Sequence, residues 1–172
     1  ARLLWILILA SLAYPAHAGP AFPWKAGDKP PKFMGVTLGD KMERVIQTLG
    51  QPHERIAMGQ GVTLLVFKAG GVRVFVSQAD GASVITARSS AAGTLGGLRV
   101  GSSRDAVTGK WGNPHSAKGT SALYNAGVWS VSLKLDDGGS QLIDITLAWN
   151  QSKWSNELKN VDPSKVQVLR PK

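Results

Sequence analysis

The sequence contains no cysteine among its 172 residues. This absence excludes disulfide bonds, thiol nucleophiles and cysteine-ligated metals, and it leaves no thiol that could carry a lipid. Acidic residues are also scarce, with 11 aspartates and glutamates against 20 lysines and arginines. The resulting net charge of +9 points to an anionic partner, unless it serves solubility alone.

Long hydrophobic runs are absent after the first residues. Residues 3–14 are apolar apart from Ser11, and Ala16-His17-Ala18 matches a small-x-small cleavage site. We therefore predict a signal peptide over residues 1–18, export to the periplasm or the extracellular space, and no transmembrane span after its removal. Export argues against nucleic acid as the partner.

Groups that could perform catalysis are also few. His53 and His115 follow Gly-x-Pro in loops, and neither has the neighbouring ligands that a metal site needs. Residues 136–139, Asp-Asp-Gly-Gly, lack the spacing of a calcium loop and predict a hairpin turn instead. No nucleophile elbow or phosphate-binding fingerprint occurs. We predict no catalytic residues, no metal site and no cofactor, with an enzyme as the least favoured alternative.

A short pattern that the sequence does contain occurs twice. At a constant spacing of 62 positions, Gly39, Val45, Gly50, Pro52 and His53 recur as Gly101, Val107, Gly112, Pro114 and His115. Self-similarity at a fixed spacing is typical of repeat architectures. Each copy predicts a helix that ends at its second glycine, because glycine followed by proline stops a helix.

Strands are predicted after each helix. Alternating apolar residues and glycine-containing turns predict strands over residues 63–67, 72–77 and 83–87, and again over 122–124, 128–135 and 142–149. The expected fold class is therefore α+β: two tandem helix-plus-antiparallel-hairpin repeats, with the helices packed on one sheet face. Whether the two sheets join stays open at this point.

The domain organisation follows from these elements. After the signal peptide we expect a proline-rich leader over residues 19–34, in which Trp24 and Phe33 tuck against the domain. Repeat unit one covers residues 35–92 and repeat unit two covers residues 93–149. A basic tail over residues 150–172 completes the chain.

The repeated pattern resembles a known family. The resemblance rests on Val36-Thr37-Leu38-Gly39, Val45 and Leu49-Gly50-Gln51-Pro52, and on Val100-Gly101-Ser102, Val107 and Trp111-Gly112-Asn113-Pro114. It covers nearly all of residues 35–149. These segments are similar to the small α+β repeat of the β-lactamase-inhibitor-protein-like superfamily, which also occurs in outer-membrane assembly lipoproteins of the SmpA/OmlA type. The resemblance implies two sheets that form one concave binding face.

Strand alternation leaves a polar, partly basic sheet face as the candidate binding site. Its predicted residues are Arg73, Phe75, Ser130, Ser132 and Lys134. An exposed aromatic beside an arginine is a suitable anchor for a protein partner.

We therefore expect an exported, non-enzymatic module that binds an extracytoplasmic protein, in an inhibitor-like or envelope-assembly-like manner. The alternative is a basic envelope-associated module that holds anionic lipid or wall polymer, with salt-sensitive affinity. The identity of the partner and the oligomeric state do not follow from the sequence.

Overall fold

The computed structural model describes residues 19–150 and 167–169. The predicted signal peptide and most of the predicted basic tail therefore lie outside the described residues. Two α-helices are present in this part of the chain, α1 (Met42–Leu49) and α2 (Arg104–Trp111). Neither is long or apolar enough to cross a membrane.

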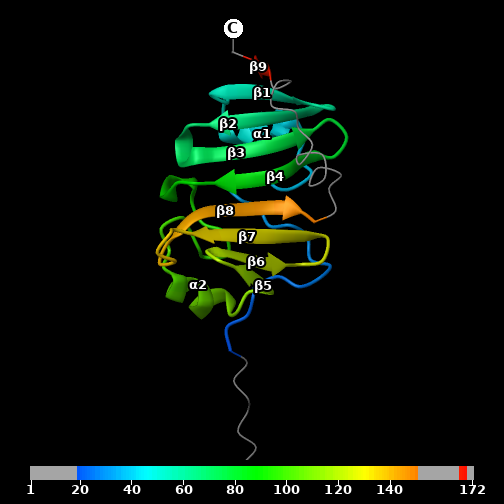
Figure 1. Ribbon diagram of the computed structural model, residues 1–172. Helices are drawn as coiled ribbons and strands as arrows, with labels where there is room; N and C mark the ends of the chain where they lie inside the picture. The colour runs from blue at the N-terminus through cyan, green and yellow to red at the C-terminus, as the bar shows by residue number, and fades with distance from the viewer. Residues whose placement is uncertain (1–18, 151–166, 170–172) are drawn as a thin grey trace, which may run out of the picture.

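The strands form one antiparallel sheet (Figure 1). The strands are β1 (Glu54–Gly59), β2 (Val62–Phe67), β3 (Val72–Ser77), β4 (Gly81–Ala87), β5 (Ser116–Lys118), β6 (Ser121–Asn125), β7 (Trp129–Leu135), β8 (Leu142–Trp149) and β9 (Gln167–Leu169). Their order across the sheet is β5-β6-β7-β8-β4-β3-β2-β1-β9. Two short 3-10 helices, η1 (Ala69–Gly71) and η2 (Ser90–Ala92), lie in connections.

The prediction of two tandem helix-plus-hairpin repeats with helices packed on a sheet face is wrong. β4 pairs directly with β8, for example Val84 with Ala148, so every strand belongs to one sheet. Each helix has only eight residues, about 12 Å of length, which is too short to form a covering layer. We call α1 with β1–β4 the first half and α2 with β5–β8 the second half.

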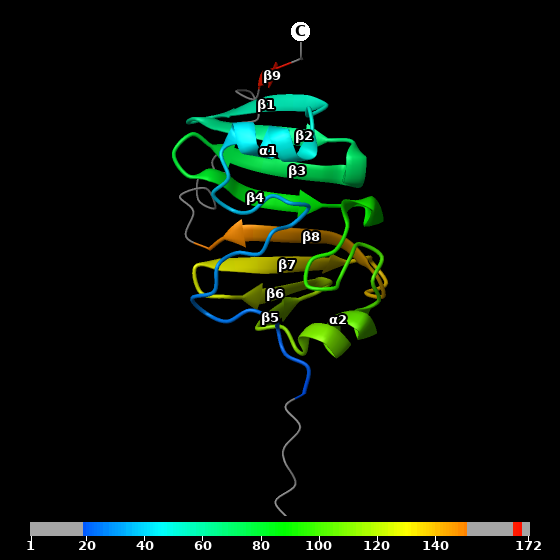
Figure 2. The ribbon, with the colours of Figure 1, turned by 180° about the vertical axis from the view of Figure 1, so that it is seen from behind.

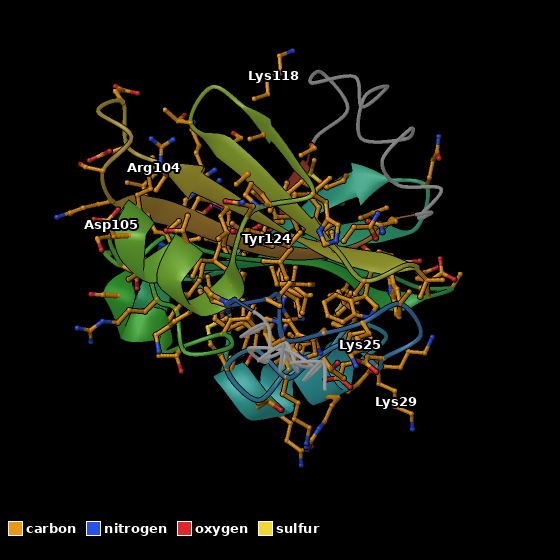
Figure 3. The ribbon with its side chains drawn as sticks, turned by 90° about the horizontal axis from the view of Figure 1, so that it is seen from below. Lys25, Lys29, Arg104, Asp105, Lys118 and Tyr124 are labelled. Carbon is orange, nitrogen blue, oxygen red and sulfur yellow. The ribbon has the colours of Figure 1, made fainter. Side chains whose placement is uncertain are left out.

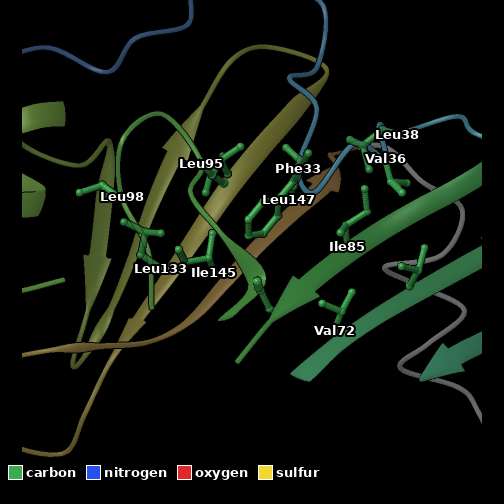
Figure 4. Packing of buried hydrophobic residues seen from close by; sticks show 14 of the residues in the cluster. Phe33, Val36, Leu38, Val72, Ile85, Leu95, Leu98, Leu133, Ile145 and Leu147 are labelled. Atoms are coloured by element: carbon green, nitrogen blue, oxygen red, sulfur yellow. The ribbon is translucent and has the colours of Figure 1, made fainter. Parts of the chain in front are cut away.

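Irregular segments supply much of the cover on one side of the sheet, which we call the covered face (Figure 2). From these segments, Phe33, Val36, Leu38, Leu95 and Leu98 are buried in the core. They face buried strand residues such as Ile85, Leu133, Ile145 and Leu147 (Figure 4). The helices add only Val45, Val107 and Trp111 to the buried set.

The proline-rich leader is part of this cover. Phe22 and Trp24 enter an aromatic cluster with Trp111, Tyr124 and Trp129, with ring centroids 5.2–6.4 Å apart. The Trp129 indole N–H donates to the carbonyl oxygen of Asp28 at 2.7 Å, across 101 positions of sequence. The leader is therefore packed against the second half and hydrogen-bonded to it.

The hydrogen-bond registers of the two halves correspond. The Gly39 N–H donates to Ala82 O at 2.8 Å, and the Gly101 N–H donates to Leu142 O at 2.7 Å. The β4–β8 ladder has the same symmetry, because Ile85 pairs with Leu147 and Ala87 pairs with Ile145 on either side of the Thr86–Thr146 pair. Equivalent positions of the halves can therefore be compared.

One strand differs from its predicted alternation. The sequence places Ile143, Ile145, Leu147 and Trp149 on one inward face. Ile145 and Leu147 are buried, but Ile143 is 40% exposed and Trp149 is half-buried. The β7–β8 register shifts between Lys134 and Leu135, and the resulting bulge takes Ile143 out of the core.

Candidate functional site

The side of the sheet opposite the covered face, which we call the open face, carries all five residues predicted for binding. One cross-strand row consists of Arg73, Thr86, Thr146 and Ser132. The next row consists of Phe75, Val84, Ala148 and Ser130. Lys134 pairs with Asp144 in a third row. The β4–β8 pairing thus unites predicted site residues of both halves on one surface.

These five residues differ in exposure. Arg73 and Lys134 are exposed, whereas Phe75 and Ser132 are half-buried. Ser130 is only 7% exposed, so its side chain belongs to the floor of the face and offers little to a partner. The accessible predicted residues are therefore Arg73, Phe75, Ser132 and Lys134.

A hydrogen-bonded network occupies the junction of the halves. The Arg88 Nε–H donates to Asp144 Oδ2 at 2.9 Å, and the Thr146 hydroxyl donates to Asp144 Oδ1 at 2.8 Å. Thr146 Oγ1 also lies 3.0 Å from Thr86 Oγ1. The Asp144 side chain is 14% exposed against 55% for Arg88, so the carboxylate is the fixed member of the ion pair.

Sequence reasoning missed Arg88 and Thr86 as members of this face. They lie 56 and 60 positions before their partners, Asp144 and Thr146. No local pattern signals such a pairing, because it exists only when the two halves share a sheet.

The charge of the junction is basic. Lys134 pairs across strands with Asp144, the carboxylate that already forms the ion pair with Arg88, and Arg73 adds a further positive charge two strands away on β3. Basic groups beside the half-buried Phe75 suit a partner that offers acidic side chains around an apolar contact.

The two histidines hold local roles in the structure. The His115 Nδ1 accepts a hydrogen bond from the Asn125 N–H at 3.1 Å. His53 Nε2 lies 3.8 Å from Glu54 Oε1. Among residues 19–150 and 167–169, no three histidine or acidic side chains gather as a metal site would require.

The turn over residues 136–141 joins β7 to β8, as the prediction of a hairpin turn requires. Asp136 accepts hydrogen bonds from the Ser140 N–H at 2.7 Å and the Ser140 hydroxyl at 2.9 Å. These bonds hold the pKa of the Asp136 carboxyl below its ordinary value. Burial raises the pKa of the Tyr124 phenol, whose hydroxyl donates to Gly112 O at 2.9 Å.

No family model matches the chain, and no curated protein matches it in sequence. Solved structures do share its fold. An extracellular protein containing an SCP domain from Bacillus anthracis matches with a TM-score of 0.58 and 13% identity, over 86% of this chain and 55% of that chain. A cysteine-rich secretory protein from Staphylococcus aureus matches with a TM-score of 0.55 and 13% identity, over 77% of this chain and 51% of that chain.

The chain therefore spans about half the length of these two solved structures. At 13% identity the similarity establishes the class of fold and nothing about activity.

The resemblance to the β-lactamase-inhibitor-protein-like superfamily is wrong, because the matching folds are those of these extracellular proteins. The motif was misleading for a physical reason. Gly50 and Gly112 end helices at positive φ, and proline follows two positions later. Many unrelated folds stop a helix before a strand in this way.

Proposed function

We propose that this protein is an exported, non-enzymatic binding module whose open face contacts a protein partner. The observation that carries the proposal is the continuity of the sheet through β4 and β8. It joins Arg73 and Phe75 of the first half to Ser132 and Lys134 of the second half. A contact surface made by both halves is larger than either half could offer alone.

The chemistry of the open face supports a protein as the partner. Arginine and aromatic side chains contribute most often to the binding energy of protein interfaces. Phe75 offers apolar surface, and Arg73 in the adjacent row offers a charged planar group. Asp144 is held by Arg88 and Thr146, so part of the polar surface is fixed before a partner arrives.

One prediction and one observation support export. The sequence predicts a signal peptide over residues 1–18, and the two solved structures of similar fold are an extracellular protein and a secretory protein. The same localisation is proposed for this chain.

Affinity capture from an envelope extract at low and high salt tests the proposed function. The purified protein should retain a protein partner at high salt, and Phe75→Ala should weaken that capture by about fivefold or more. Lys110→Ala, an exposed charge on α2, is the matched control and should leave capture unchanged.

Two outcomes would contradict the proposal. One is capture that Phe75→Ala does not alter. The other is capture of lipid or wall polymer at low salt only, which supports the alternative of a basic envelope-associated module.

A further inference from the structure

A cavity of about 240 Å³ lies beneath α2, on the covered face of the second half. Its apolar wall includes Val107 of α2, Leu133 and Leu135 of β7, and Leu142 of β8, each at most 7% exposed. The ring of Tyr124 closes one side, and its hydroxyl is already bonded to Gly112 O. The cavity is therefore an apolar space whose nearest buried polar group is satisfied.

The sequence explains why the helix side of this space is unfilled. Under α1, the side chains of Met42 and Ile46 pack against the core. The positions that correspond to them in α2, 62 residues later, are Arg104 and Thr108, and both line the cavity. A polar side chain thus stands at each place where the first half has a large apolar one, and Thr108 is also shorter than Ile46.

The strand wall of the cavity also carries a smaller side chain than the equivalent position in the first half. Leu65 of β2 is fully buried, and it precedes Phe67 by two positions. Tyr124 of β6 corresponds to Phe67, so Ala122 corresponds to Leu65. The change from leucine to alanine removes three carbon atoms from the wall, and Ala122 also lines the cavity. The leucines of β7 and β8 line the space that the smaller side chains leave, but they do not fill it.

Arg104 supplies the charge at this site. It is the one charged residue among the described residues that line the cavity, and it is exposed (Figure 3). Its N–H donates to Ser140 O at 2.9 Å, which fixes its backbone beside the β7–β8 turn. The guanidinium lies within 4.0 Å of no carboxylate in the described chain, the adjacent Asp105 included.

The dimensions limit the ligand to a compact molecule. A cavity of about 150 Å³ lined by aliphatic and aromatic residues holds benzene, and sites for drug-sized molecules begin near 300 Å³. A space of about 240 Å³ suits a short hydrocarbon chain or one ring with a short substituent. An unpaired arginine favours a carboxylate, because the guanidinium can donate two parallel hydrogen bonds to it.

We propose that the cavity beneath α2 binds a compact apolar carboxylate, with its hydrocarbon part against Leu133 and Leu142 and its carboxylate on Arg104. This site lies on the covered face, so it does not depend on the function proposed for the open face.

Titration of the purified protein with octanoate, followed by NMR, tests this proposal. Octanoate should saturate with a dissociation constant of about 1 mM or less and shift the signals of Val107 and Leu133. Octanol, which has the same chain length without the charge, should bind about tenfold more weakly.

Four variants identify the site. Arg104→Gln removes the charge without adding an apolar side chain and should weaken octanoate binding about tenfold, with little effect on octanol. Arg99→Gln removes the charge of an exposed arginine outside the cavity and should change neither. Ala122→Leu and, separately, Thr108→Ile restore the side chains of the first half and should weaken binding of both probes about tenfold.

Three results would overturn the proposal. The first is no saturable shift at these residues at about 10 mM octanoate. The second is equal affinity for octanol and octanoate, which would remove the role of Arg104. The third is unchanged binding in both filling variants, each shown by circular dichroism to be folded.

Discussion

At the scale of single residues, the glycines that end the two helices hold backbone conformations that other residues rarely adopt. Gly50 has φ 83° and ψ −171°, and Gly112 has φ 68° and ψ −159°. This region is accessible almost only to glycine, and another residue there costs about 1–3 kcal/mol. The two sites differ in surroundings: a Cβ at Gly50 meets nothing within 4 Å, whereas one at Gly112 would collide with the carbonyl oxygen of Pro20.

Gly112→Ala should therefore destabilise the protein more than Gly50→Ala. Both variants carry the backbone strain, but only Gly112→Ala must displace the leader at Pro20. We expect the free energy of unfolding, measured by urea denaturation, to fall by at least about 1 kcal/mol more for Gly112→Ala. Equal losses in the two variants would mean that the leader does not pack at this point.

A second prediction concerns pH. The hydrogen bonds from Ser140 lower the folded-state pKa of Asp136 below its ordinary 3.8. The stabilisation is therefore complete above the ordinary pKa and is lost as pH falls through the lowered folded-state pKa. The stability difference between the wild type and Asp136→Asn should shrink between neutral pH and about pH 2, measured by denaturant unfolding.

Asp137→Asn is the control for this measurement, because it leaves the bonds between Asp136 and Ser140 in place. A difference between the wild type and Asp136→Asn that stays constant over the whole pH range would contradict the assignment.

At the scale of elements, the leader acts as part of the core. Trp24 contacts Phe22, Trp111 and Trp129 with ring centroids 5.2–5.7 Å apart. Trp24→Ala should lower the free energy of unfolding by about 2 kcal/mol, because it removes a half-buried indole and its edge contacts. Lys25→Ala, at the adjacent exposed position, should change stability by less than about 0.5 kcal/mol. Similar small effects in both variants would contradict this role of the leader.

The elements also show what the sequence could predict. The strands β2, β3, β4, β6, β7 and β8 lie within one or two residues of their predicted bounds, because alternation and glycine turns are local signals. β1 and β5 were missed. β5 has three residues, all exposed, and β1 has no fully buried residue, so neither shows the apolar alternation of a strand.

The cover of the sheet was harder to predict. Composition indicates a proline-rich leader over residues 19–34, and of the two aromatic residues expected to tuck against the domain, Phe33 is fully buried and Trp24 is half-buried. The helices could be predicted because their apolar residues recur at helical spacing. Extended segments that bury single side chains show no such periodicity. The predicted binding residues lie on one face of the sheet, but they form one surface only through the β4–β8 pairing, which no local pattern encodes.

At the scale of the whole molecule, one sheet has two different sides. The covered face holds the core, the leader and the cavity beneath α2, whereas the open face carries charged and polar side chains from both halves. A site on either face can therefore be altered without altering the other. This separation allows the two proposed binding sites to be tested independently.

The most direct test of the central claim is to measure the affinity of the captured protein partner for variants in each half of the open face. Arg73→Ala in the first half and Lys134→Ala in the second half should each weaken binding by about fivefold or more, while Lys110→Ala on α2 should not. Loss in both halves would support one contact surface that spans the β4–β8 junction. Loss in only one half, or in neither, would contradict it.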